Sequence, residues 1–258
     1  MDRKRVITVI MVMVALGASL LLIYRSVRMH TGDAAVKDDK AISTSDLPGA
    51  AEAVEADRNE EDDPVFRISA EGLVGRWNMT CDATGPEPEA RPQVQLPPLG
   101  GMETYLTDEA VHTGHKTRHY IYEPGDPAFY PVLDIYVSEK SGEVLQIELT
   151  YDEHSYREST WQIHQEMCVT ALKALMPEKD EQVLKKLCAE VCNLAADEIF
   201  PAEQVYQRGS VPRMLYHSGG AGMYSYFAAG SRSHFCIIPV DDQVMKQFED
   251  GGAKIVRF

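Results

Sequence analysis

An uncharged stretch of 19 residues near the N-terminus constrains this chain more than any other feature. Residues 6–24 contain no charged side chain and consist mainly of Val, Ile, Leu and Met. As an α-helix the stretch would be roughly 28 Å long, close to the ~30 Å hydrocarbon core of a bilayer. A chain in lipid must satisfy its own backbone hydrogen bonds, so we expect this stretch to form a single membrane-spanning helix.

A cleavable signal peptide is the alternative interpretation of the same stretch. The apolar region of a signal peptide is about 7–15 residues long and ends at a small-residue cleavage site. Here the apolar run continues through residues 20–24, past the small residues that precede them, which favours an uncleaved anchor. Three basic residues precede the stretch and two follow it, so the positive-inside rule favours a cytoplasmic N-terminus. We therefore expect a single-pass protein of a bacterial inner membrane with a periplasmic C-terminal domain; a eukaryotic secretory membrane is the alternative.

Residues 29–64 have the composition of a disordered linker. They contain eleven acidic residues against three basic ones and no aromatic residue. Such a segment buries too little apolar surface to offset the conformational entropy lost on folding. The sequence thus divides into a cytoplasmic stub with the anchor (residues 1–28), an acidic linker (29–64) and an extracytoplasmic domain (65–258).

The charge balance disfavours nucleic acid as a partner. The chain has 25 Lys and Arg residues against 40 Asp and Glu residues; five of the bases and one of the acids lie in residues 1–28, so the rest carries 20 against 39. A nucleic-acid-binding protein needs a basic surface that displaces counterions from phosphates. The expected partners are the lipid bilayer, through residues 6–24, and a protein or polymer outside the cytoplasm.

The hydrophobic pattern of the C-terminal domain indicates an α+β fold. Helical spacing predicts one helix at residues 159–175 and a second that begins at Pro177 and presents apolar residues as far as Ala195. Strands on both sides of a helix pair, without βαβ alternation, indicate a largely antiparallel sheet covered by an antiparallel helical hairpin. The predicted strands are residues 73–81, 102–111, 115–122, 132–137, 143–151, 214–217, 223–229, 233–240 and 253–258.

The predicted helical hairpin carries the most specific side-chain pattern. His164 and Cys168 are four residues apart on the first helix, and Cys188 and Cys192 are four apart on the second, so each pair shares one helix face. Antiparallel packing would bring Cys168 to Cys188 and His164 to Cys192. Three interpretations stay open: a Cys168–Cys188 disulfide, buried unpaired thiols, and a zinc or copper site made by all four residues.

Two enzymatic hypotheses are less specific. His112, His115 and His119 flank a predicted turn, and three imidazoles there could hold zinc in a metal-assisted hydrolase. Cys188 and Cys192 could instead serve a thiol redox protein. An exposed polar hairpin edge is the simpler interpretation of the histidines.

No recognised motif assigns a catalytic residue or a cofactor. The glycine-rich residues 218–222 match no nucleophile elbow, phosphate-binding loop or dinucleotide fingerprint. We therefore expect a non-catalytic binding or scaffold module. Aromatic and Met residues of the late strands would form its contact surface, although they also fit an ordinary sheet core. These residues are Tyr216, Met223, Tyr224, Tyr226 and Phe227.

Overall fold

The computed structural model describes residues 52–83, 94–107, 115–125, 130–152, 158–192, 214–228 and 232–258. The chain divides into two units, residues 1–46 and 47–258, and every element below belongs to the second. The predicted anchor and residues 29–51 of the predicted linker lie outside the described residues. Among the helices of the described ranges, none combines the length and apolarity that a membrane crossing requires.

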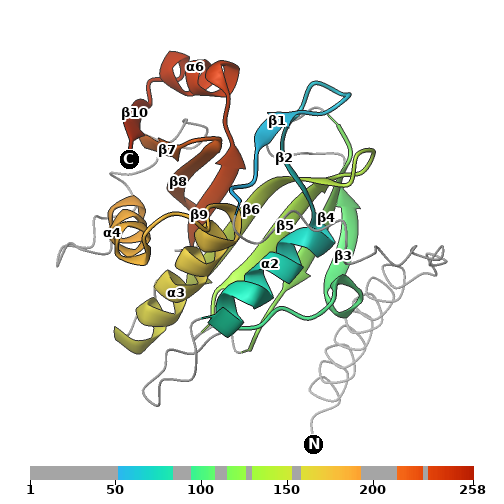
Figure 1. Ribbon diagram of the computed structural model, residues 1–258, viewed down its shortest axis with the longest axis vertical. Helices are drawn as coiled ribbons and strands as arrows, with labels where there is room; N and C mark the ends of the chain where they lie inside the picture. Colours follow the sequence, from blue (N-terminus) through green and yellow to red (C-terminus); the bar gives the residue numbers. More distant parts are fainter. Residues whose placement is uncertain are drawn as a thin grey trace, which may run out of the picture. The chain divides into compact units, whose positions relative to one another are not determined.

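A sheet of ten strands forms the centre of the described fold (Figure 1). The strands are β1 (Ala56–Arg58), β2 (Pro64–Ser69), β3 (Glu103–Thr107), β4 (Thr117–Tyr122), β5 (Val132–Ser138), β6 (Glu143–Asp152), β7 (Met214–Ser218), β8 (Ala221–Ala228), β9 (Arg232–Pro239) and β10 (Lys254–Arg257). Their main order is β10-β7-β8-β9-β6-β5-β4-β3, and β2 pairs with both β1 and the start of β6. Within the described residues only β10 and β7 pair in parallel, so the predicted α+β fold with a mostly antiparallel sheet is confirmed.

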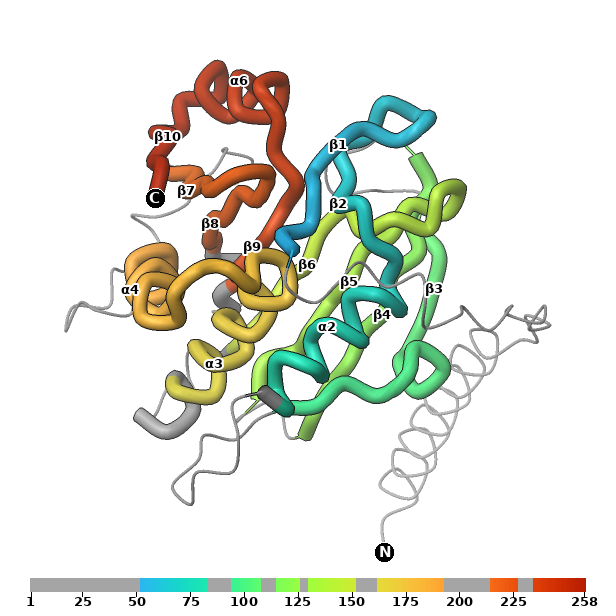
Figure 2. The backbone as a smooth tube through the Cα atoms, in the orientation of Figure 1, coloured from blue at the N-terminus to red at the C-terminus, as the bar shows by residue number. Residues whose placement is uncertain are grey.

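Four α-helices lie in the described part of the chain: α2 (Ala70–Ala83), α3 (Glu158–Leu175), α4 (Glu181–Val191) and α6 (Asp242–Asp250). Helices α2 and α3 pack side by side across one face of the sheet (Figures 1 and 2). Helix α4 packs against α3 and also contacts β8. The expected helical hairpin is therefore present as α3 and α4, but α2 shares the covering of the sheet with it.

Each face of the sheet has its own apolar core. On the first face, Trp77 of α2 and Leu172 of α3 are buried together with Ile135 of β5. On the opposite face, Val244 and Phe248 of α6 are buried against the β7–β9 side of the sheet. Successive strand residues point to opposite faces, which is why one sheet contributes to two cores. Among the described helices, only α6 contributes to the second core.

Residues 73–81 form helix α2 and not the predicted strand. Leu73, Trp77 and Cys81 are four residues apart, and this spacing places side chains on one face of a strand and also of a helix. Val74 is buried as well, which fits a helix but not an alternating strand. Trp77 fixes the helix in place, because its side chain is 1% exposed and its Nε1 donates a hydrogen bond of 2.7 Å to the Val94 carbonyl.

The other predicted strands are confirmed as β3 to β10, whereas β1, β2 and α6 were not anticipated. The prediction that Pro177 opens the second helix of the hairpin is wrong. Asp180 is the N-cap of α4, since its side chain accepts hydrogen bonds from the backbone N–H groups of Gln182 and Val183. An Asp side chain can accept hydrogen bonds from the free N–H groups of the first helical turn, which a Pro side chain cannot do.

The described fold begins at Glu52, inside the segment assigned to the linker. The Val54 N–H donates to the Leu175 carbonyl at 2.8 Å, and β1 pairs with β2. Ala56 lies so close to Gly220 that a Cβ added there would be 2.5 Å from the Ala56 Cβ. The acidic composition of residues 52–64 is thus compatible with order, because their backbone is hydrogen-bonded while most of their acidic side chains reach solvent.

Candidate functional site

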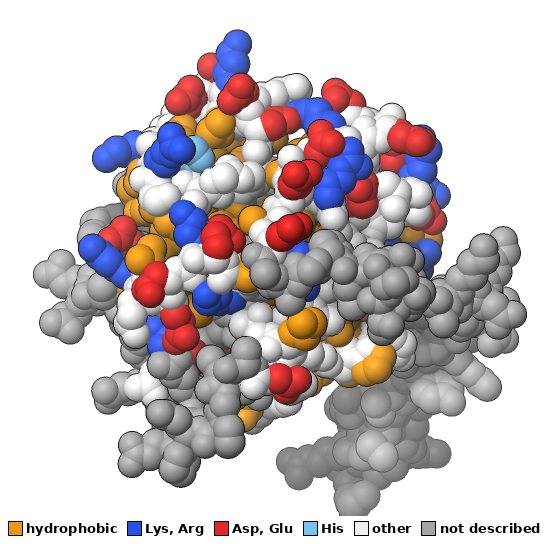
Figure 3. Space-filling view, viewed as in Figure 1, with side chains coloured by type: hydrophobic (Ala, Val, Ile, Leu, Met, Phe, Trp, Pro, Cys, Tyr) orange, Lys and Arg blue, Asp and Glu red, His pale blue; other side chains and the backbone are white. Residues whose placement is uncertain are grey.

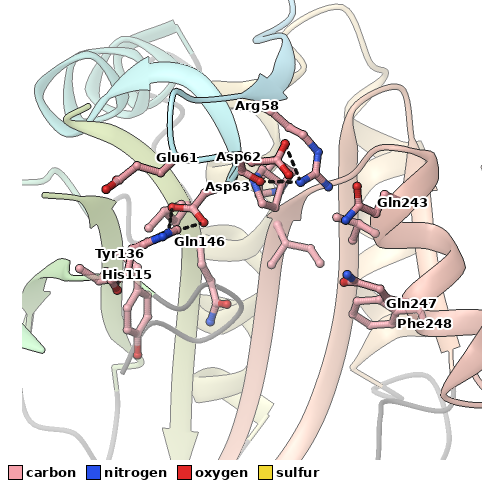
Figure 4. Close-up of a pocket in the computed structure, with 16 residues that line it drawn as sticks. Arg58, Glu61, Asp62, Asp63, His115, Tyr136, Gln146, Gln243, Gln247 and Phe248 are labelled. Atoms are coloured by element: carbon pink, nitrogen blue, oxygen red, sulfur yellow. Dashed lines mark hydrogen bonds and ion pairs between the residues drawn. The ribbon is translucent and has the colours of Figure 1, made fainter. Parts of the chain in front are cut away.

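A cavity of about 290 Å³ lies between the β1–β2 loop, the sheet and α6 (Figure 4). Its acidic side is formed by the loop, its floor by β5 and β6, and its apolar and amide-bearing side by α6 and the end of β9. The side chains used below are Arg58, Glu61, Asp62, Asp63, His115, Tyr136, Gln146, Gln243, Gln247 and Phe248.

Asn59 shapes the acidic loop. Its Oδ1 accepts hydrogen bonds from the backbone N–H groups of Glu61 at 2.9 Å and Asp63 at 3.0 Å. Asp62 has a φ of 64°, a left-handed conformation that is uncommon outside glycine but tolerated by Asp. This tight turn holds the carboxylates of Glu61 and Asp63 near each other.

Asp63 and His115 form the best-defined polar pair of the cavity. His115 Nδ1 lies 2.9 and 3.0 Å from the two oxygens of Asp63, whose residue is only 5% exposed. The hydrogen bond to Asp63, aided by its negative charge, raises the pKa of His115. Ligand atoms of Glu61, Asp63 and His115 lie within 4.8 Å of one another, so these residues could hold a divalent cation.

Arg58 connects the loop to α6. Its Nε donates to Asp241 Oδ2 at 2.6 Å, and its Nη1 lies 3.4 Å from Asp62 Oδ1. Asp241 is itself the N-cap of α6 and accepts from the Val244 N–H at 2.8 Å. Since the charge of Arg58 is engaged by these two carboxylates, Glu61 and Asp63 leave the cavity with an excess of negative charge.

The floor of the cavity presents a buried hydrogen-bond acceptor. Gln146 is 1% exposed, and its Nε2 donates to Glu148 Oε2 at 2.7 Å, but its Oε1 has no hydrogen-bond partner. Beside it, the Tyr136 ring stacks on His119 with ring centres 4.2 Å apart. Burial, reinforced by the charges of Glu148 and Asp134, raises the pKa of Tyr136. The floor therefore offers an amide oxygen and a neutral phenol.

Two carboxylate–histidine pairs lie beside Gln146 and Tyr136, on the same face of the sheet, which is the face opposite α2 and α3. Glu148 accepts hydrogen bonds from Tyr226 Oη at 3.1 Å and from His234 Nδ1. His119 Nε2 lies 2.8 Å from Asp134 Oδ1, and burial raises the pKa of Asp134 against the opposing effect of His119. Because isolated buried charges are costly, these pairs explain how the polar side of β5 and β6 is buried.

The structure separates the histidines that were expected to share a metal. His112 lies outside the described residues. His115 pairs with Asp63, whereas His119 contacts Asp134, and no candidate metal cluster in the described ranges combines the two histidines. The sequence did not suggest Glu61 and Asp63 as partners of His115 because both fell in the segment assigned to the linker.

The structure gathers the four residues of the hairpin pattern in the core. His164 Nε2 lies 3.6 Å from Cys168 Sγ and 3.8 Å from Cys192 Sγ, and Cys168 also hydrogen-bonds with Cys188. Burial raises the pKa of Cys168. Burial also opposes ionisation of Cys192, but hydrogen bonds from Cys168 and His164 outweigh it and lower the pKa of Cys192.

All five cysteines lie in the described residues and all are free thiols, so the Cys168–Cys188 disulfide, one of the three open interpretations, is not formed in this structure. Cys188 is fully buried and Cys192 is 6% exposed. A redox cysteine must be reached by the thiol or disulfide of its substrate. The burial of both sulfurs therefore does not favour the thiol redox hypothesis.

The late-strand residues that were expected to form a contact surface are mostly core. Tyr216, Met223 and Tyr224 are at most 9% exposed and belong to the two apolar clusters. Tyr226 is half-buried and donates to Glu148, and the side chain of Phe227 lies outside the described residues. Their apolar character thus serves packing of the sheet, which was the alternative interpretation.

Comparisons with known proteins identify no family or related site. No protein-family model matches the chain, and no curated protein or solved structure shows significant similarity to it.

Proposed function

We propose that this chain is a membrane-anchored, non-catalytic binding protein whose cavity takes a small organic cation. The observation that carries the proposal is the acceptor character of the cavity: Gln146 Oε1 is buried without a partner beneath the carboxylates of Glu61 and Asp63, of which Asp63 is paired with His115. A buried acceptor left unpaired costs about 1–3 kcal/mol, which a ligand N–H would recover. An ammonium group would donate a hydrogen bond to Gln146 Oε1 and would be attracted by the carboxylates of Glu61 and Asp63.

The apolar side of the cavity defines the rest of the ligand. Phe248 and Val244 of α6 and Ile238 of β9 line it opposite the acidic loop. Ligand sites typically combine such apolar walls with a few polar groups that fix orientation. A primary amine on a short alkyl chain fits this division and the volume of about 290 Å³.

The proposed setting is the outer side of a bacterial inner membrane, with residues 6–24 as the anchor. The uncharged composition of that stretch supports it. A protein or polymer with exposed amines is the natural source of the ligand group. On the face that carries α2 and α3, acidic and basic side chains are interspersed (Figure 3), which agrees with our proposal that nucleic acid is not a partner.

Butylamine is the probe that tests the proposal, with butanol and butyrate as neutral and anionic controls. We expect butylamine alone to raise the unfolding midpoint of the full-length chain in detergent, with a dissociation constant in the millimolar range for so small a ligand. Gln146→Leu and Asp63→Asn should abolish the shift, whereas Asp57→Asn, which changes an exposed carboxylate outside the cavity, should preserve it. Equal shifts with butanol, or an unchanged shift in both cavity variants, would contradict the proposal.

A metal-assisted hydrolase is the second candidate. It is favoured by the convergence of Glu61, Asp63 and His115 within 4.8 Å. A divalent cation held by three such residues keeps open positions where a water can be activated. Ester hydrolysis that requires added Zn²⁺ or Mn²⁺ and disappears in His115→Ala would favour this candidate over the binding protein.

A further inference from the structure

The buried cluster of His164, Cys168 and Cys192 lies outside the acidic cavity and places three potential metal ligands in the core. It joins two helices: His164 and Cys168 lie one turn apart on α3, and Cys192 is the C-cap residue of α4. The three residues are at most 6% exposed. Their ligand atoms are all within 4.8 Å of one another.

The two distances from His164 to the cysteine sulfurs match those between ligands around one metal ion. Zinc lies about 2.3 Å from thiolate sulfur and about 2.0–2.1 Å from imidazole nitrogen, so ligands in tetrahedral positions stand roughly 3.5–3.8 Å apart. His164 Nε2 is 3.6 Å from Cys168 Sγ and 3.8 Å from Cys192 Sγ. Cys188, which hydrogen-bonds with Cys168, adds another thiol beside the cluster.

We propose that His164, Cys168 and Cys192 bind a structural Zn²⁺ ion that fastens the end of α4 to α3. Charge favours a divalent ion: two thiolates, one neutral imidazole and Zn²⁺ sum to zero, whereas a monovalent ion such as Cu⁺ would leave a net negative charge in the core. Structural zinc sites are closed by four protein ligands, and Cys188, buried beside Cys168, is the residue that can complete the set.

The ion would hold more than the two helices. Val191, next to Cys192, accepts a hydrogen bond from Ser225 Oγ of β8, so the end of α4 is also tied to the sheet. Binding transfers free energy to the fold, because the site is not formed in the unfolded chain. Loss of zinc should therefore loosen α4 before it affects the cavity on the other side of the sheet.

Metal analysis of the full-length chain tests the proposal. We expect one zinc per chain after purification in detergent from zinc-supplemented cells, and thiolate-to-metal charge-transfer bands when Co²⁺ replaces Zn²⁺. Cys168→Ala and Cys192→Ala should weaken zinc binding by more than the roughly 10–100-fold that outer-shell substitutions cost. Cys81→Ala is the matched control, since Cys81 is equally buried but lies on α2 away from the cluster, and it should bind zinc as the unmodified chain does.

A second measurement covers the case in which the cysteine variants fail to fold. Chelation of zinc from the unmodified chain should lower its unfolding midpoint, and added zinc should restore it. Absence of bound metal and of cobalt bands in the unmodified chain would overturn the proposal, as would copper in place of zinc. A disulfide from Cys168 to Cys188 or Cys192 in protein prepared without reductant would also overturn it. Zinc that is lost only in His115→Ala would place the metal in the acidic cavity and not here.

Discussion

Glu148→Ala tests whether a charged network is truly buried behind the cavity. The Glu148 side chain is 4% exposed and accepts hydrogen bonds from Gln146 Nε2, Tyr226 Oη and His234 Nδ1. Removing the carboxylate takes away a shared acceptor of three groups, although Gln146 Nε2 also lies 3.8 Å from Cys236 Sγ and His234 Nδ1 lies 3.1 Å from Thr150 Oγ1. Each unsatisfied buried donor costs about 1–3 kcal/mol.

The three costs do not simply add in full. The His234 side chain is 14% exposed, so water can replace part of what it loses. Removal of Glu148 also removes the desolvation cost of a buried charge. We therefore expect a loss of about 3–5 kcal/mol in the free energy of unfolding, the range measured when one partner of a buried ion pair is deleted. For a domain of this size that corresponds to a fall on the order of 10 °C in Tm.

Glu143→Ala is the matched control on the same strand. Glu143 pairs at 2.8 Å with Arg67, whose side chain is 39% exposed and also holds Asp57 at 2.6 Å. Such a surface pair contributes about 0–1 kcal/mol. Urea unfolding followed by the fluorescence of the two tryptophans, of which Trp77 is buried, measures both variants. If Glu148→Ala cost no more than Glu143→Ala, the network would not be the buried, mutually dependent unit described above.

Two further predictions concern the His115–Asp63 pair of the cavity and the packing of β1 against Gly220. Because Asp63 raises the pKa of His115, an NMR titration should place the His115 midpoint above the ordinary value of about 6.5, and Asp63→Asn should return it to that value. The stability that this pair contributes is complete below the pKa of His115 in the unfolded chain. It is lost as the pH rises through the pKa of His115 in the folded chain. A midpoint at or below the ordinary value would contradict the pairing. Gly220→Ala should destabilise the domain by about 1–3 kcal/mol, since the new Cβ would meet Ala56 at 2.5 Å, whereas Gly100→Ala, with open space around its Cβ, should leave the urea midpoint nearly unchanged.

Strand pairing was the part of the fold most readable from sequence. Residues 132–137 and 143–151 alternate apolar and polar side chains with a short turn between them. They agree with β5 and β6, which begin at the predicted residues and each extend one residue further. Strand prediction from alternation fails where the same spacing also fits a helix. In residues 73–81 the apolar residues are four apart, which places them on one face of either element. The burial of Val74 and the exposure of Met79 distinguish the two, and both are tertiary properties.

The candidate sites were predictable only where their residues share one element or one hairpin. The helical spacing of His164, Cys168, Cys188 and Cys192 anticipated the contact of His164 with Cys192. The acidic cavity was not anticipated, because Asp63, Gln146 and Phe248 come from segments more than 80 residues apart and their meeting depends on sheet topology. The cap at Asp241, followed by Val244 and Phe248 at helical spacing, was the available signal for α6.

The attachment of β1 has a mechanical consequence. The chain enters the domain through Glu52 and Val54, runs along β2 as β1 and turns at once into the loop that carries Glu61 and Asp63. A force applied through the residues before Glu52 would act first on the hydrogen bonds of Glu52 with Arg76 and of Val54 with Leu175, and then on the short β1 ladder and the contact of Ala56 with Gly220. Peeling of β1 would displace the acidic wall while the larger sheet stayed intact, so tension on the N-terminal segment would open the cavity before it unfolded the domain.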